Sequence, residues 1–284
     1  MRQTTNPQGP SSGDPISAAE AGRSTGGSLP KPAAVLLGQA APAAWLTATV
    51  ANVAEQLALD EALLEAAHAG HVVRPVVRTW MAAEPTVVVG SSSRIDEEVD
   101  RAACAGAGIP ILRRPSGGLT VVLGPGCVMW SVVAPIATAA PAIDRIHSAI
   151  LDPLAAALVT AGRPVVRRGS SDLALSTADG ERKVSGNALR VRRGGVLYHG
   201  TLLDAFDLEL VARLLRHPPR EPSYRARRNH AAFLANLGLG RPAIDRAVRQ
   251  AFSVANDHAV WPQERVAELA RDRYSSRDWT ERLA

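Results

Sequence analysis

The sequence predicts an α+β protein whose mixed, mainly antiparallel sheets are flanked by helices. Short runs of β-branched and aliphatic residues recur in groups, and helical patterns stand singly between them. Strand and helix do not alternate regularly, which favours antiparallel or mixed pairing over an all-parallel sheet. The chain has 284 residues, 46% of them hydrophobic, which is enough to bury a substantial core.

Order is expected to begin near residue 35. Residues 1–34 are rich in Gly, Pro, Ser, Thr and Ala and hold almost no large apolar side chains. Such a segment cannot offset the entropy cost of ordering, so we predict a disordered N-terminal extension, residues 1–34, followed by one domain over residues 35–284.

The elements of this domain follow from local patterns. Helical spacing of apolar residues predicts amphipathic helices, and β-branched runs bounded by Gly or Pro predict strands. Gly124-Pro125-Gly126 and Arg193-Gly194 are predicted to close two hairpins, and Asp207 is predicted to cap a helix. The expected helices span residues 51–69, 96–105, 142–161, 207–215, 242–256 and 262–273, and the expected strands span 76–80, 86–89, 109–113, 119–123, 128–133, 164–168, 172–175, 181–191 and 195–203.

Composition excludes several classes of protein. Only 4% of residues are aromatic, which leaves little material for stacking bases, so no nucleic-acid partner is expected despite a net charge of +5. No apolar run is long enough to cross a membrane. Two cysteines, Cys104 and Cys127, do not make a disulfide framework, and a cytoplasmic location is expected.

Two arginines precede a turn of small residues, in the segment Arg113-Arg114-Pro115-Ser116-Gly117-Gly118. Glycines let the backbone approach a ligand and present N–H groups to an anion, and the arginines add positive charge. The segment therefore indicates an anion site. An ordinary turn with two surface arginines remains the alternative.

A lysine precedes a Ser-Gly turn in the segment Arg182-Lys183-Val184-Ser185-Gly186-Asn187-Ala188. Alternation along a strand would place Lys183 and Ser185 on one side. A lysine held there would neutralise the oxygens of a mixed anhydride and orient its acyl carbonyl. A solvated lysine on an edge strand is the alternative.

Two further segments complete the candidate set. His199-Gly200-Thr201 follows a strand pattern and could line a pocket, although a lone histidine is often structural. Asp172 follows a Gly-Ser-Ser turn and could bind a magnesium ion or position a nucleotide, because magnesium needs few protein carboxylates. A turn or capping role is the alternative for Asp172.

Together these segments resemble the catalytic domain shared by lipoate–protein ligases, octanoyltransferases and biotin–protein ligases. The lipoate–protein ligase A branch is the most similar. The resemblance covers residue 35 to the C-terminus. It implies the fold of this shared catalytic domain, without the C-terminal accessory domain of the long ligases. It implies that Lys183 is the catalytic lysine. It further implies a substrate and ATP site formed by Arg113, Arg114, Ser116, Gly117, Gly118, Asp172, Ser185, Gly186, Asn187, Ala188, His199, Gly200 and Thr201.

The resemblance also implies a reaction. Lipoate, ATP and magnesium give lipoyl-adenylate, and a lysine of a lipoyl acceptor then takes the acyl group. The acceptor would be a lipoyl domain or a protein like the glycine cleavage H protein, and a separate accessory subunit would replace the missing domain if one is needed.

Two alternatives stay open. One is an octanoyltransferase that takes its acyl group from acyl carrier protein, without ATP, through a cysteine thioester. In the branch of octanoyltransferases most like ligases, that cysteine lies between the Asp and Lys motifs. Here that interval, residues 173–182, has none, so only Cys127 would serve. The other alternative is a non-catalytic binding subunit, since Leu119 and Leu123-Gly124 replace a glycine and a His-Asp pair of the family loop.

Overall fold

The computed structural model describes residues 42–136, 142–178, 180–258 and 260–284. The predicted extension, residues 1–34, lies outside the described residues. Within them, eight strands form one sheet in the order β11-β1-β2-β6-β10-β9-β8-β7, and three form a second in the order β4-β3-β5. The large sheet consists of β1 (Ala44–Leu46), β2 (Val76–Met81), β6 (Cys127–Pro135), β7 (Val165–Arg168), β8 (Asp172–Thr177), β9 (Gly180–Arg192), β10 (Gly195–Leu203) and β11 (Asn256–His258), and the small sheet of β3 (Thr86–Val89), β4 (Ile111–Arg113) and β5 (Val121–Leu123).

Strand pairing confirms the predicted fold class. Most neighbouring strands of the large sheet are antiparallel, from β2 across β6, β10, β9 and β8 to β7. Parallel pairs occur between β1 and its two neighbours and between β3 and β4. The molecule is therefore α+β, with mixed but mainly antiparallel sheets.

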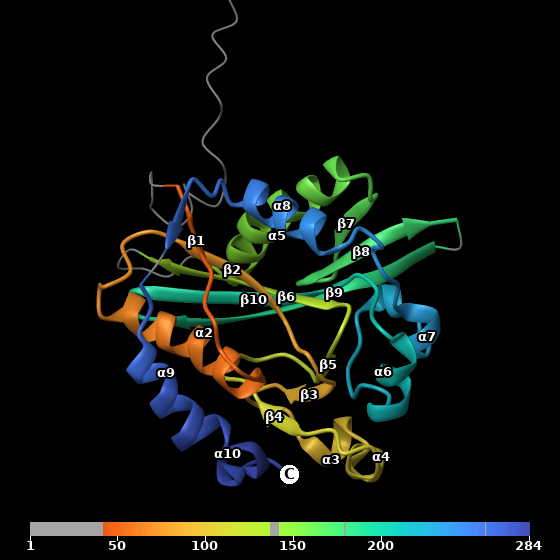
Figure 1. Ribbon diagram of the computed structural model, residues 1–284. Coiled ribbons are helices and arrows are strands. Elements are labelled where there is room, and N and C mark those ends of the chain that lie inside the picture. Colours follow the sequence, from red (N-terminus) through yellow and green to blue (C-terminus); the bar gives the residue numbers. More distant parts are fainter. Residues whose placement is uncertain (1–41, 137–141, 179, 259) are drawn as a thin grey trace, which may run out of the picture.

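Helices cover both faces of the large sheet (Figure 1). Helices α5 (Ile143–Thr160) and α8 (Arg241–Ala251) pack together on one face, over a core where Trp130 stacks against Tyr198 and Phe252. Helices α2 (Val53–His68) and α9 (Gln263–Leu269) pack on the other, over a second core that includes the small sheet. Shorter elements complete the chain: α3 (Ile95–Glu98), α4 (Arg101–Gly106), α6 (Leu208–Leu214), a 3₁₀ turn (Ser223–Arg225), α7 (His230–Phe233), a π-helical turn (Ala270–Tyr274) and α10 (Arg277–Glu281).

Helix α2 confirms the helix predicted over residues 51–69. Asn52 caps it by accepting a hydrogen bond from the Glu55 N–H at 3.0 Å, which satisfies one of the free donors of the first turn. The buried face of the helix is wider than the predicted apolar face, however. Asp60 and Glu61 are as deeply buried as the leucines around them, so the helix has a polar buried stripe as well.

The predicted hairpin around Gly124-Pro125-Gly126 is wrong. Strand β5 pairs with β3 in the small sheet, whereas β6 pairs with β2 and β10 in the large one. The three residues instead carry the chain between the sheets. Gly126 has φ +82°, and a Cβ there would lie 2.2 Å from the Ala205 carbonyl oxygen, so close packing against the chain after β10 selects glycine.

Most other local predictions hold with shifted ends, but the helix predicted over residues 96–105 is interrupted by extended backbone at Val99 and Asp100, which separates α3 from α4. The β9–β10 hairpin is confirmed, as is the Asp207 cap, which accepts from the Glu209 N–H at 3.0 Å. The helix predicted to reach residue 256 ends at Ala251, and Asn256–His258 forms edge strand β11. The helix predicted over residues 262–273 changes to a π-helical turn at Ala270. None of the described helices is both long and apolar enough to cross a membrane.

Candidate active site

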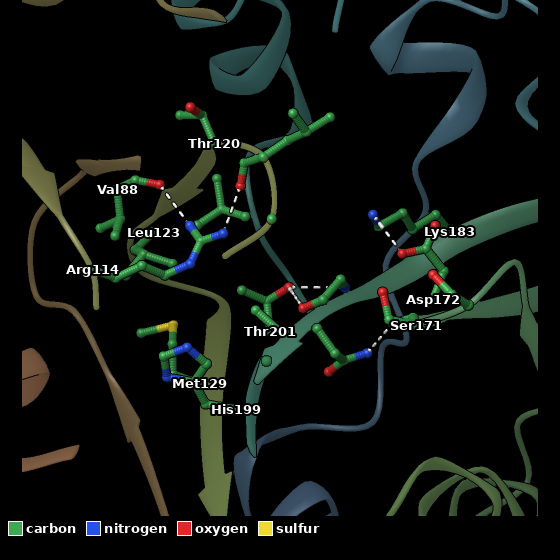
Figure 2. A pocket seen from close by; sticks show the side chains of 18 of the residues that line it. Val88, Arg114, Thr120, Leu123, Met129, Ser171, Asp172, Lys183, His199 and Thr201 are labelled. Atoms are coloured by element: carbon green, nitrogen blue, oxygen red, sulfur yellow. Dashed lines mark hydrogen bonds and ion pairs between the residues drawn. The ribbon is translucent and has the colours of Figure 1, made fainter. Parts of the chain in front are cut away.

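A cavity of about 640 Å³ lies where the two sheets meet. One side of its wall is mainly apolar but also carries Arg114 and His199, and the opposite side carries Asp172 and Lys183. Figure 2 shows Val88, Leu123 and Met129 with Arg114 and His199 on the first side and Asp172 and Lys183 on the other, with Thr201 between them. The apolar wall consists of Leu57, Trp80, Val88, Val121, Leu123, Met129 and Trp130. The shape suits an acyl chain joined to a polar head.

Lys183 and Asp172 form an ion pair at the polar wall. The Lys183 Nζ lies 2.8 Å from Asp172 Oδ1, and the Tyr224 hydroxyl donates to Asp172 Oδ2 at 3.0 Å. Lys183 comes from β9 and Asp172 from β8, its neighbour. A Cβ on Gly186 would lie 2.9 Å from the Lys183 Nζ, so glycine leaves room for the ammonium group. These contacts fix the position of the Lys183 ammonium group in the cavity.

Strict alternation along β9 does not hold at the lysine motif. The register with β8 shifts between Leu173 and Ala174, which is the mark of a bulge. Lys183 lines the cavity, whereas Ser185 is fully buried and does not. The expectation that both lie on one side therefore does not apply, because the bulge interrupts the two-residue period.

Asn187 frames the turn before Asp172. Its Nδ2 donates to the Ser171 carbonyl at 2.7 Å, and its Oδ1 accepts from the buried Ser185 hydroxyl at 3.2 Å. Gly200 on β10 must lack a side chain, because a Cβ would lie 1.7 Å from Asn187 Oδ1. The Gly186 N–H donates to the Thr201 hydroxyl at 3.3 Å. These contacts connect β8, β9 and β10 around the charged pair.

Arg113 does not line the cavity. It is fully buried and donates to four backbone carbonyls, those of Gly90, Ser93, Thr280 and Leu283, at 2.7, 2.7, 2.9 and 3.1 Å. The Trp279 indole N–H donates back to the Arg113 carbonyl at 2.8 Å. Arg113 thus ties β4 to the C-terminal segment.

Arg114 does line the cavity. Its guanidinium donates to the carbonyls of Val88, Gly117 and Leu119 and to the Ser116 hydroxyl. No described carboxylate forms an ion pair with it, and burial lowers its pKa to about 10. A buried cation without a paired acid favours an anion in the adjoining cavity.

His199 lines the cavity, and both of its ring nitrogens are engaged. Its Nδ1 lies 2.9 Å from Asp60 Oδ2, and its Nε2 lies 2.6 Å from the Ser116 hydroxyl. Asp60 Oδ1 accepts from Arg78 and from the Ser131 hydroxyl at 2.9 Å. Burial alone would raise the pKa of Asp60, but the charge of Arg78 and the hydrogen bond from His199 outweigh it and lower the pKa to about 2.

Because the pKa of Asp60 is lowered, we expect the free energy of unfolding to depend on pH in the acid range. Because the folded-state pKa lies below the ordinary 3.8, ionised Asp60 stabilises the protein above pH 4, and this contribution is lost as pH falls towards 2. Against an Asp60→Asn variant, the advantage of the wild type should shrink by about 1 kcal/mol between pH 5 and pH 3. Urea unfolding at each pH measures it, and a constant difference would contradict it.

The structure therefore sorts the candidate residues into two groups. Those that line the cavity are Arg114, Gly118, Asp172, Lys183, Gly186, Asn187, Ala188, His199, Gly200 and Thr201. Arg113, Ser116, Gly117 and Ser185 are not part of the lining; Ser116 and Gly117 bind Arg114 of the wall and Ser185 binds Asn187, whereas Arg113 binds Gly90, Ser93 and the C-terminal segment. Three charged residues of the lining were not anticipated as site residues: Asp60, Arg220 and Glu221. A signal for Asp60 exists, since two acids interrupt an apolar helix.

No accessible thiol faces the cavity. The chain has two cysteines, Cys104 in α4 and Cys127 at the start of β6, and both are buried. Burial raises the pKa of Cys104, and it raises the pKa of Cys127 to about 12. Since the thiolate is the nucleophilic form, both thiols are unreactive in this fold. Among the described residues, no cluster of three or more His, Cys, Asp or Glu side chains forms a metal site.

The fold and this cavity define an enzyme domain that handles acyl groups. The chain belongs to the lipoyl protein ligase A/B catalytic domain family, whose model matches residues 52–250. The family predicted from the motifs is thereby confirmed.

Curated relatives in this family include octanoyltransferases. The chain is 28% identical over 258 residues to octanoyltransferase LipM of Carboxydothermus hydrogenoformans, a match that covers 80% of this chain and 93% of the relative. It is 30% identical over 226 residues to octanoyltransferase LipM of Symbiobacterium thermophilum, covering 72% of this chain and 82% of the relative.

Solved structures with the same fold include lipoate–protein ligases. A bi-partite lipoate protein ligase of Thermoplasma acidophilum, studied with its E2 lipoyl domain, has a TM-score of 0.70 at 22% identity and covers 86% of this chain and 97% of its own. A lipoate-protein ligase A bound with ATP has a TM-score of 0.66 at 23% identity, and the match covers 86% of this chain and 100% of the ligase chain. At these identities the likeness establishes the shared fold.

Proposed function

We propose that this protein is an ATP-dependent lipoate–protein ligase, which activates lipoate to lipoyl-AMP and transfers the lipoyl group to a lysine of an acceptor domain. One observation carries the proposal: the cavity holds Lys183 and Asp172 as a charged pair and no thiol. Lipoate would lie along the apolar wall with its carboxylate towards Arg114 and Lys183.

The relatives named octanoyltransferases support a second candidate, acyl transfer from acyl carrier protein without ATP. The expected intermediate of that reaction is a thioester on a cysteine. Cys127 is fully buried with a raised pKa, and Cys104 lies in α4, outside the cavity lining. A thioester would need a thiolate in reach of the acyl group, so the second candidate is less well supported.

The proposed chemistry has two steps. The lipoate carboxylate oxygen bonds to the α-phosphorus of ATP, and the bond from that phosphorus to pyrophosphate breaks. The acceptor lysine, having lost a proton, then attacks the acyl carbon, and AMP leaves with the bonding electrons. Lys183 would neutralise the negative charge that gathers on the oxygens in both steps, a stabilisation that a fixed ammonium provides without reorganisation.

Magnesium would accompany ATP. An ion that is carried mainly by phosphates and water needs few protein ligands, so one carboxylate at the polar wall fits the requirement. Asp172 would supply that oxygen, and the ion would neutralise phosphate charge. Among the described residues Asp172 is the carboxylate in contact with Lys183.

The test is ligation of lipoate to a lipoyl domain, or to a protein like the glycine cleavage H protein, followed by intact mass spectrometry. We expect a lipoyl-sized gain that requires ATP and magnesium. A gain only with octanoyl acyl carrier protein would replace the proposal by the transferase. A gain that also requires an added accessory subunit would show that ligation depends on a second protein.

Replacement of both cysteines by alanine separates the two functions in a different way. The Cys104→Ala, Cys127→Ala variant should keep ATP-dependent ligation within about threefold of the wild type, because neither thiol touches the cavity, although core truncation lowers its melting temperature. Ligation rates are measured well below that temperature. Complete loss of acyl transfer in a folded variant would favour the thioester route.

A further inference from the structure

A continuous chain of buried hydrogen bonds runs from α2 to the loop that follows β4. Arg78 on β2, Ser131 on β6 and His199 on β10 are registered neighbours across the large sheet. All three donate to Asp60 on the helix above. His199 continues the chain to Ser116, and Ser116 continues it to Arg114.

The direction of each hydrogen bond follows from chemistry. A carboxylate only accepts, and Asp60 is ionised, so the His199 Nδ1 must carry the proton at this 2.9 Å contact. In neutral imidazole the other nitrogen is then an acceptor. In this neutral form the Ser116 hydroxyl donates to His199 Nε2 at 2.6 Å and is free to accept from the Arg114 Nε–H at 3.1 Å.

Arg114 is the end of this chain and the centre of the loop. Its two terminal nitrogens donate to Val88, Gly117 and Leu119 carbonyls, so the guanidinium shapes the loop between β4 and β5. The loop fits tightly against the residue that follows β3, because a Cβ on Gly90 would lie 1.9 Å from the Gly118 oxygen. A turn of the guanidinium would move the cavity wall with it.

His199 faces the cavity but has no ring nitrogen left for a substrate. Apolar side chains of the same volume would hold a core at least as well as this set of buried polar groups. The arrangement therefore serves orientation more than stability, and the group that it orients is Arg114, a buried cation of the cavity wall that forms no ion pair with a described residue.

We propose that Asp60 is a positioning residue for the acyl site: it sets the tautomer of His199, which through Ser116 orients Arg114 towards the carboxylate of the acyl substrate. The carboxylate role rests on the proposed function, whereas the hydrogen-bond chain does not depend on it. Asp60 itself needs no contact with the substrate, since it acts through the two side chains between.

Two serine variants form a matched pair. Ser116 and Ser131 are each 1% exposed, and each donates one hydroxyl hydrogen bond to the same network, but only Ser116 contacts Arg114. Ser116→Ala should weaken the binding of lipoate, measured by calorimetry, at least tenfold and lower kcat/KM for ligation about 100-fold. Ser131→Ala should change neither by more than about threefold, with a similar fall in melting temperature. Equal losses in both variants, or none in Ser116→Ala, would overturn the proposal.

The tautomer is read directly by the ¹⁵N shifts of the histidine side chains, with the His199 signal assigned by its absence in His199→Gln. The wild type should show a proton on Nδ1 and none on Nε2. Asp60→Asn should increase the population protonated on Nε2 and weaken lipoate binding as Ser116→Ala does. An unchanged tautomer in a folded Asp60→Asn protein would refute the inference. If the wild type shows no ATP-dependent ligation but the tautomer shifts and lipoate binding falls, the proposed function fails and the positioning role stands.

Discussion

Replacing Lys183 by alanine is expected to abolish ligation, with at least a 1000-fold fall in rate, because the cavity loses the ammonium group that in the proposed reaction would face both the mixed anhydride and the phosphate oxygens. The side chain is 27% exposed and its partner Asp172 12%, so the change should cost little stability. Formation of lipoyl-AMP and transfer from preformed lipoyl-AMP are measured separately by mass spectrometry. Both steps should fail, since the same charge serves each.

Arg182→Ala is the matched control. It removes a cation of similar reach one residue away, but Arg182 does not line the cavity and forms no ion pair with a described residue. Ligation by this variant should stay within about threefold of the wild type. A Lys183→Ala protein that is folded and still ligates lipoate at a comparable rate would remove the basis of the proposed function. A protein that binds an acceptor domain but transfers nothing even as wild type would instead be a binding subunit.

Replacing Arg113 by methionine is expected to lower the free energy of unfolding by about 3 kcal/mol or more. Methionine fills much of the volume but donates to none of the four carbonyls that Arg113 satisfies, and those carbonyls remain buried. Urea unfolding measures the loss. Because two of the four lie in the C-terminal segment, limited proteolysis should also cleave near α10 earlier than in the wild type.

Arg271→Met provides the control for this effect. Arg271 pairs with Asp272, but both side chains are more than 60% exposed, so their pair contributes little. Its unfolding free energy should change by less than about 0.5 kcal/mol. An Arg113→Met protein as stable as the Arg271→Met protein would show that the C-terminal segment is held by its apolar contacts alone.

Local patterns predicted most of the elements because they depend on neighbours in the sequence. Asp207 caps the helix that follows it, and Arg193-Gly194 closes the β9–β10 hairpin, where the pairing partners are adjacent along the chain. The β5–β6 hairpin was wrong for the opposite reason. A Gly-Pro-Gly turn permits a hairpin, but the position of β3 decides which sheet β5 joins.

The sequence by itself determined the α+β class, the family, and the motifs that meet at one cavity, because strand patterns and motif chemistry depend on residues that are close together in the sequence. The tertiary structure alone decided which member of each motif lines the cavity: Arg114 and Lys183 do, whereas Arg113 and Ser185 are buried outside its lining. It also decided that Asp60, in the middle of a helix, takes part in the site. The physical reason is that a buried polar group is defined by its partners, and those of Asp60 lie on three strands far from it along the chain.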